Sequence, residues 1–309
     1  MLTRRRIYPR AAFPAVILLL SVCNALFAMD RELNLSVYQG PCKEGDFTAN
    51  LATVRRVTVE ALARGSDFLV FPETFLSGYD NLEKMRLAAR RIDDPELSVF
   101  IAESTAHKMV ICVGLARITE KGTCNSVLVI QGGRLLGIYN KVMLTQRDRD
   151  VLKFVPGEDV PVFEANGARF AVNICHDTSF PYPALLARLK GAEILFTPHY
   201  NSLAAQEMDA HRKWVRNCHI GLACQLKMIV ARSNVVVTDI PGQPGYGDSF
   251  IISPMGEMLA EAALFREELL TAKVGPEMFK FPYVWANLNE TPKWLKERVA
   301  GELDLNSQP

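Results

Sequence analysis

The stretch TANLATVRRVTVEALARGSDFLVFPE, residues 48–73, decides the fold class. Apolar residues recur at helical spacing over Thr48–Arg64, which predicts a helix facing a core. Phe68–Phe71 is a continuous apolar run, typical of a buried strand, and Leu33–Tyr38 predicts another strand before the helix. The order strand, helix, strand forms a βαβ unit. Such a unit predicts a parallel strand pair in a sheet that is covered by helices.

Outward from this unit, helical and strand patterns alternate along the chain. Further helices are predicted over Asp94–Lys108, Tyr182–Lys190, about Gln206–Leu226 and Pro292–Leu303, and further strands over Met109–Ile118, Ser126–Gln131, Arg134–Tyr139, Val160–Phe163, Arg169–Ile174, Ile194–Thr197, Met228–Arg232, Ser249–Ser253, Met258–Glu261 and Leu269–Val274. Gly132-Gly133 and Asn166-Gly167 predict hairpins. We expect one α/β domain over residues 29–309 that mixes parallel units with hairpins.

The composition excludes several classes of function. The chain has 35 Lys and Arg against 34 Asp and Glu, so no overall field favours nucleic acid. Its 7 cysteines are an odd number and form no CxxC pair, so neither a disulfide framework nor a zinc site is indicated. We therefore expect no metal and no nucleic-acid partner, and a reducing compartment.

Three reactive residues follow predicted strands, where α/β sheets place their sites. They are Glu73, Lys141 and Cys175. A cysteine at a strand-to-helix turn can become a nucleophile if a cation stabilises its thiolate. A lysine can supply that charge and stabilise an oxyanion, and a glutamate can move the protons. Taken singly, each residue also fits a structural role, as a buried thiol, a helix cap or a surface charge.

The sequence around these residues resembles the nitrilase, or carbon–nitrogen hydrolase, superfamily. The resemblance rests on DFLVFPETFLSGY (67–79), YNKVML (139–144), FVPG (154–157) and ICHDTSFP (174–181). Supporting matches are GAEIL (191–195), RSN (232–234) and GDSFIISPMGE (247–257). The matches occur in order and span the chain from about Leu33 to Val274.

The resemblance implies a four-layer αββα sandwich without metal or organic cofactor, usually dimeric through the layer that carries the nucleophile. It implies that Cys175 is the nucleophile, Glu73 the general base and acid, and Lys141 the oxyanion stabiliser. The implied activity is hydrolysis of a non-peptide C–N bond in a small amide, ω-amide or carbamoyl amine through a thioester. A nitrile substrate and a non-catalytic binding member of the same fold are the alternatives, and a homodimer or higher homo-oligomer is expected.

Departures from the family pattern concern the residues around the triad. Many members carry a second glutamate shortly before the Pro-Gly pair, and Asp150 occupies that place here, with Asp148 as its rival. We predict that one of them, with Asp150 the first candidate, orients Lys141 or the leaving amine. Ser179 stands where an arginine is common.

Four further residues are candidates for substrate binding. His176 follows the nucleophile directly, and it either packs the turn or lines the substrate pocket. His199, Tyr200 and Asn201 follow another predicted strand, so we expect them at the rim of the same pocket.

Residues 1–28 allow two interpretations. Arg4–Arg10 followed by Ala11–Ala28 is typical of a signal peptide, whereas an over-long N-terminus would start at Met29 instead. The apolar run is short and interrupted, so no stable membrane span is expected. We expect a cytoplasmic mature protein, because a cysteine nucleophile must stay reduced.

Overall fold

The computed structural model describes residues 29–236, 242–280 and 291–306. The possible signal peptide at residues 1–28 therefore lies outside the described residues. The strands are β1 (Leu33–Gln39), β2 (Phe68–Val70), β3 (Val110–Thr119), β4 (Gly122–Gln131), β5 (Arg134–Asn140), β6 (Val162–Ala165), β7 (Ala168–Val172), β8 (Ile194–Pro198), β9 (Ile229–Ser233), β10 (Phe250–Ile252), β11 (Met258–Glu261) and β12 (Glu268–Val274). The helices are α2 (Phe47–Ala63), α3 (Leu82–Ala88), α4 (Pro95–Glu103), α5 (Gln146–Asp150), α6 (Pro181–Leu189), α7 (Ala205–Leu226) and α8 (Lys293–Asn306), with 3₁₀ turns η1 (Ser104–Ala106), η2 (Cys175–Ser179) and η3 (Pro276–Phe279).

The strands form two six-stranded sheets of similar construction. Their orders are β12-β1-β2-β3-β4-β5 and β11-β10-β9-β8-β7-β6. In the first sheet β1, β2 and β3 run parallel, and in the second β7, β8 and β9 do, while the outer strands join as antiparallel partners. The parallel pairing of β1 with β2 confirms the βαβ unit that residues 48–73 predict.

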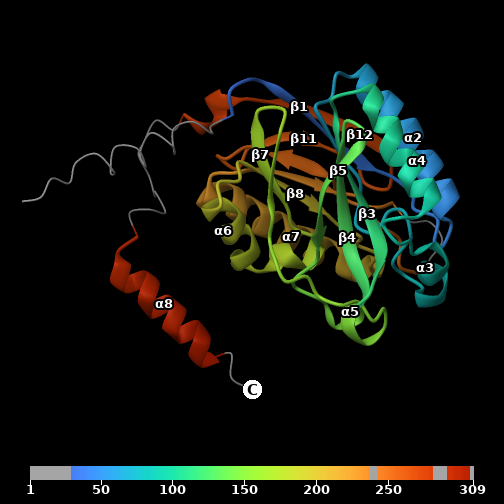
Figure 1. The fold of residues 1–309 in the computed structure, drawn as a ribbon. Helices are drawn as coiled ribbons and strands as arrows, with labels where there is room; N and C mark the ends of the chain where they lie inside the picture. Colours follow the sequence, from blue (N-terminus) through green and yellow to red (C-terminus); the bar gives the residue numbers. More distant parts are fainter. Residues whose placement is uncertain (1–28, 237–241, 281–290, 307–309) are drawn as a thin grey trace, which may run out of the picture.

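Four layers result from packing the two sheets face to face (Figure 1). Helices α2 and α4 cover the outer face of the first sheet, and α6 and α7 cover the second. Between the sheets, the ring of Phe68 lies 5.2 Å from Phe170 and 5.5 Å from Phe196, centroid to centroid. Continuous apolar strands are explained by this arrangement, because each sheet is buried on both faces. The predicted αββα sandwich is confirmed.

The predicted elements differ from the structure mainly near the loops that follow the strands. Neither α3 nor α5 was predicted from the sequence, because both are short and α5 contains no apolar residue. The start of α5 is nevertheless encoded locally. Thr145 and Asp148 form a capping box, in which each side chain accepts the other residue's backbone N–H. This short helix decides which carboxylate reaches the site described below.

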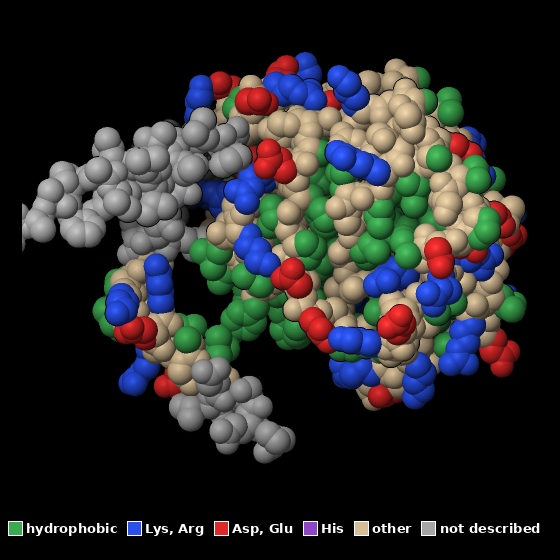
Figure 2. Space-filling view, viewed as in Figure 1, with side chains coloured by type: hydrophobic (Ala, Val, Ile, Leu, Met, Phe, Trp, Pro, Cys, Tyr) green, Lys and Arg blue, Asp and Glu red, His purple; other side chains and the backbone are tan. Residues whose placement is uncertain are grey.

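The surface of the body shows apolar side chains over α6 (Figure 2). Tyr182, Leu186 and Leu189 on α6, and Trp214 on α7, are exposed. Within the described ranges, no helix combines the length and apolarity that crossing a bilayer requires.

Candidate active site

Glu73 and Lys141 meet between the sheets at the ends of β2 and β5. The Lys141 Nζ lies 2.7 Å from Glu73 Oε1, and both side chains are 0% exposed. Asn125 Nδ2 also donates to Oε1, at 2.7 Å, and the backbone N–H of Tyr200 donates to Oε2, at 3.0 Å. Three donors therefore fix the orientation of the carboxylate, as a proton-transfer group requires.

The turn that carries Glu73 packs tightly against the neighbouring strand. A Cβ on Gly114 of β3 would lie 2.3 Å from the backbone N of Thr74 and 2.5 Å from the carbonyl O of Pro72. Only glycine allows this approach. Thr74 itself has φ +44°, a left-handed backbone conformation in the turn directly after Glu73.

Burial and pairing tune the charges of the two groups. Burial raises the pKa of Glu73 above its ordinary value, although the Lys141 ammonium acts in the opposite direction. Burial alone would lower the pKa of Lys141, but the Glu73 carboxylate leads the charges that hold it well above its ordinary value. The site thus combines a permanent cation with a carboxylate whose proton affinity is increased.

Cys175 comes to this pair on the turn after β7. It is the first residue of η2, is partly exposed, and has φ +46°. Positive φ at a residue with a Cβ stores backbone strain, which is frequent at active sites. Burial raises the pKa of the thiol, and the negative charge of Glu73 raises it further. The resting sulfur is therefore a thiol, and a base must remove its proton before it can attack.

Asp177 connects the cysteine turn to the lysine loop. Its carboxylate accepts hydrogen bonds from Ile174 N and Met143 N, both at 2.7 Å, and from the Tyr139 hydroxyl at 2.6 Å. One buried side chain thus fixes the residues directly before Cys175 and shortly after Lys141. Asp177 lies within the motif around Cys175, but the sequence alone carries no signal for this role.

The carboxylate that pairs with Lys141 is Asp148, so the preference for Asp150 is wrong. Asp148 Oδ2 lies 2.8 Å from Lys141 Nζ, and Oδ1 accepts from the Tyr79 hydroxyl at 2.7 Å. Asp150 is exposed. The two residues lie two positions apart on α5, and such positions point to different sides of a helix. The capping pattern that starts at Thr145 was the available signal.

The structure predicts opposite outcomes for these two neighbouring aspartates. Asp148→Asn removes a negative charge from Lys141 and places an amide there, so the kcat of the C–N hydrolysis that the sequence predicts should fall about 100-fold. Asp150→Asn should leave kcat within about twofold of wild type, because the side chain is exposed. Steady-state ammonia release from both variants makes the comparison. Equal losses would show that the pairing with Lys141 does not matter to catalysis.

The four substrate-binding candidates lie in different surroundings. His176 is partly exposed, and its ring packs edge-on against Phe180 at 5.2 Å. His199 is 2% exposed, and its Nδ1 bonds the Thr197 carbonyl, so its side chain belongs to the core rather than to a pocket rim. Tyr200 binds Glu73 through its backbone, and Asn201 directs Nδ2 to Cys175 Sγ at 3.6 Å. Asn201 therefore reaches the candidate nucleophile directly.

His199 shares its core position with His219, whose charge state affects stability. The two rings lie 5.0 Å apart, and burial lowers the pKa of His219 to about 3. Below its ordinary pKa of 6.5, the unfolded chain binds a proton at this residue that the folded chain does not. The unfolding free energy should therefore fall as pH falls from 6.5 towards 3.

We expect this histidine to cost about 1.4 kcal/mol of stability at pH 5.5 relative to pH 7.5. Asp177, whose pKa is raised to about 6, acts with the opposite sign, so the total slope does not isolate His219. The contribution of His219 is isolated by comparing wild type with His219→Gln. Urea unfolding at both pH values should show that the variant loses less unfolding free energy than wild type between pH 7.5 and pH 5.5. Identical losses would contradict a buried neutral imidazole at His219.

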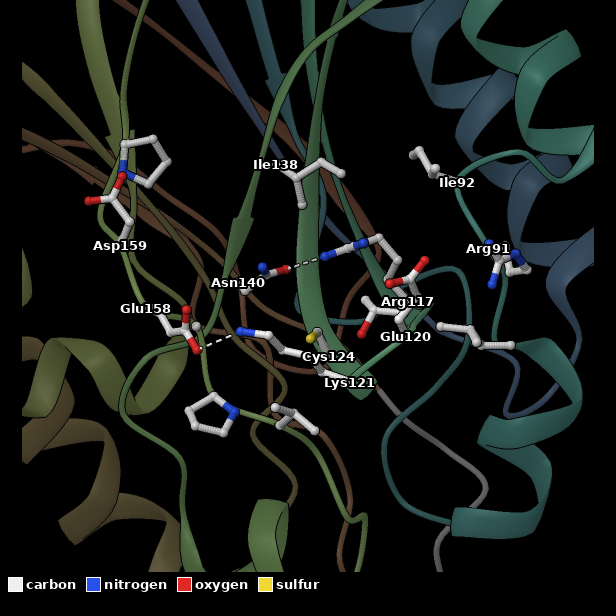
Figure 3. Close-up of a pocket in the computed structure, with 16 residues that line it drawn as sticks. Arg91, Ile92, Arg117, Glu120, Lys121, Cys124, Ile138, Asn140, Glu158 and Asp159 are labelled. Carbon is white, nitrogen blue, oxygen red and sulfur yellow. Dashed lines mark hydrogen bonds and ion pairs between the residues drawn. The ribbon is translucent and has the colours of Figure 1, made fainter.

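A separate pocket of about 600 Å³ lies on the other face of the first sheet (Figure 3). Cys124 of β4 lines it, whereas the next residue, Asn125, points to Glu73, and successive residues of a strand face opposite sides. Lys121 pairs there with Glu158 at 2.9 Å. None of Glu73, Lys141 and Cys175 lines this pocket. Within the described residues, no group of three or more His, Cys, Asp or Glu could hold a metal ion.

Comparison with known proteins finds relatives that match most of the chain. The carbon-nitrogen hydrolase family model matches residues 34–294. The N-carbamoylputrescine amidase of Arabidopsis thaliana is 28% identical over 267 residues, which cover 81% of this chain and 89% of that protein. Nitrilase 2 of the same plant is 24% identical over 276 residues, or 77% of this chain and 78% of the relative.

Among solved structures, the carbon-nitrogen hydrolase from Helicobacter pylori G27 is similar in fold. It superposes with a TM-score of 0.72 at 20% sequence identity, and the match covers 86% of this chain and 98% of that one. At this identity the likeness establishes the sandwich architecture alone.

Proposed function

We propose that Cys175 attacks the carbonyl carbon of a substrate with a non-peptide C–N bond and forms a thioester with it. The starting point is that this chain belongs to the carbon–nitrogen hydrolase family and is an amidase-like hydrolase. The observation that carries the proposal is the buried contact of 2.7 Å between Lys141 and Glu73, beside Cys175 on a strained turn, whose thiol interacts with both groups. Nucleophile, proton carrier and cation then meet at one place.

In the proposed first half-reaction, the Glu73 carboxylate takes the proton of the Cys175 thiol. The sulfur forms a bond to the carbonyl carbon, and the carbonyl electron pair moves to oxygen, where the Lys141 ammonium stabilises it. The oxyanion then re-forms the carbonyl and expels the nitrogen. Glu73 gives the departing nitrogen its proton, so ammonia or an amine leaves as a neutral molecule.

In the second half-reaction, Glu73 removes a proton from a water molecule that attacks the thioester carbon. Lys141 again stabilises the oxyanion, and its collapse releases the acid and the thiolate, which recovers the proton from Glu73. Asp148 holds Lys141 at 2.8 Å throughout and keeps it protonated. Because Glu73 gives and takes the same proton, its raised pKa suits both directions.

A carbamoyl amine with a cationic end is the substrate class that we propose. Glu44 Oε2 and Asp80 Oδ2 are buried side-chain atoms without a hydrogen-bond partner among the described residues. Tyr200 donates to Glu44 at 2.5 Å, and its ring lies 5.4 Å from Tyr79, which lies 5.6 Å from Lys141 Nζ. Two carboxylates separated from Lys141 by these tyrosine rings would favour binding of a substrate that carries an ammonium group. The similarity to an N-carbamoylputrescine amidase supports the same class.

Ammonia release from a panel of similar compounds that differ in charge tests the proposal. The panel holds N-carbamoylputrescine, its neutral analogue butylurea, the anionic N-carbamoyl-β-alanine, butyramide and butyronitrile. We expect kcat/KM to be at least about tenfold higher for the cationic compound than for butylurea, since a hydrogen bond to a charged group contributes about 1.5–3 kcal/mol. The preference should weaken as pH falls below about 6, because the pKa of Asp80 is raised by burial to about 6.

The other outcomes separate the alternatives. Turnover of the nitrile alone would favour a nitrilase, which uses the same residues through a thioimidate. No turnover of any compound would favour a binding member of the fold. The homodimer that the family resemblance implies stays a prediction, with the exposed apolar residues of α6 as its proposed contact.

A further inference from the structure

We propose that Asn201 is a further catalytic residue, whose side-chain N–H stabilises the thiolate of Cys175, and that the buried Arg232 is the residue that positions it. This inference rests on the proposed function of Cys175 as nucleophile. It assigns a role to residues in the two motifs at 232–234 and 247–257, which the proton-transfer chemistry leaves unexplained.

The orientation of the Asn201 amide is fixed by its neighbours. Its Oδ1 accepts from Arg232 Nη2 at 2.7 Å and from the Tyr246 hydroxyl at 3.3 Å. A guanidinium has no acceptor, so only the oxygen of the amide can face it. The NH₂ group must therefore point the other way, to Cys175 Sγ at 3.6 Å. The backbone is held too, because Asn201 N donates to Asn234 Oδ1 at 2.9 Å.

Arg232 is unusual because it is buried without a direct carboxylate partner in the described structure. It is 0% exposed, and its hydrogen bonds go to neutral oxygens: the carbonyls of Gly247 and Asp248, the Tyr246 hydroxyl and Asn201. The Asp248 carboxylate pairs instead with Arg212 and Arg216 on α7. An unpaired buried charge is costly, so a core that keeps one at this position has a reason other than stability.

The chemical effect of this arrangement falls on the sulfur. A guanidinium bonded to the amide oxygen draws electron density from the nitrogen and strengthens its N–H as a donor. A thiolate gains more from that donor than a thiol does, because the hydrogen bond becomes charge-assisted. Asn201 therefore favours transfer of the thiol proton to Glu73. Lys141 acts on Glu73 and the oxyanion, whereas Asn201 acts on the sulfur itself.

Alkylation of Cys175 by iodoacetamide tests the inference without requiring turnover. The rate constant would be measured from pH 6 to 9 by peptide mass spectrometry, with the exposed Cys224 of α7 as the internal control. Asn201→Asp keeps an acceptor for Arg232 and deletes the donor, and Asn201→Ala deletes the donor without adding charge. Both should slow alkylation of Cys175 at least about tenfold and leave Cys224 unchanged. Both should also lower kcat for the amide more than they raise KM.

Arg232→Lys tests the positioning role. Lysine keeps the charge but loses the planar fork, so Cys175 should alkylate at a rate between wild type and Asn201→Ala, with Cys224 again unaffected. The inference is overturned if Asn201→Ala reacts at the wild-type rate, or if only the charged Asn201→Asp slows. If Cys175 of the wild type resists alkylation while Cys224 reacts, the proposed function of Cys175 as nucleophile is contradicted. That outcome differs from a failure of the Asn201 inference, in which Cys175 reacts equally fast in wild type and variants.

Discussion

Cys175→Ala is expected to abolish C–N hydrolysis, with kcat reduced at least about 10⁴-fold. The sulfur forms the covalent bond in both half-reactions of the proposed mechanism, and no neighbouring side chain can replace it. Glu73 and Lys141 would remain paired at 2.7 Å in the variant, so substrate should still bind with similar affinity. Steady-state ammonia release and equilibrium binding of the preferred substrate measure the two effects separately.

The fold should tolerate this change, which makes the loss interpretable. Cys175 is partly exposed and alanine is only slightly smaller, so the unfolding free energy should change by less than about 1 kcal/mol. Cys218→Ala is the matched control, since Cys218 on α7 is also partly exposed and lies outside the triad. Turnover by Cys175→Ala at more than about 1% of the wild-type rate would exclude this cysteine as the nucleophile.

Lys141→Met should have the largest effect on stability. The ammonium lies 2.7 Å from Glu73 and 2.8 Å from Asp148, and all three side chains are 0% exposed. Removing it leaves two buried carboxylates facing each other, which destabilises a protein by about 3–5 kcal/mol. One of them, Glu73, can relieve the repulsion by taking a proton, so the loss should be smaller at pH 5 than at pH 8.

Urea unfolding at the two pH values measures this effect. Lys121→Met serves as the control, because that lysine also forms an ion pair, with Glu158 at 2.9 Å, but its side chain is 69% exposed. It should leave the midpoint nearly unchanged. A Lys141→Met protein as stable as wild type at pH 8 would mean that the two carboxylates do not both carry charge in the folded state.

The sequence predicts the fold well because its strands are buried on both faces. A continuous apolar run such as Phe68–Phe71 has few alternatives once a helix and a second strand accompany it. Short polar elements are harder to predict. α5 has only five residues and no apolar face, so its existence depends on a capping box rather than on periodicity.

The sequence predicts site residues only where they directly follow a recognisable strand. Glu73, Lys141 and Cys175 each follow a strand, and the edge of a sheet brings such positions together. Asn125 lies within β4 and Arg232 within β9, so their roles depend on contacts between distant strands. A local pattern carries no signal for such contacts. Counting residues back from Pro156 gave Asp150, whereas the helical turn places Asp148 at Lys141.

The most direct test of the central claim is the mass of the Cys175 peptide during turnover. The wild-type protein would be mixed with its preferred substrate from the panel, quenched in acid after a few turnovers and digested. If Cys175 is the nucleophile, a fraction of its peptide should carry the acyl or carbamoyl group of the substrate, and the Cys175→Ala protein should carry none. An acyl group on another residue, or turnover with no covalent adduct at any quench time, would contradict it.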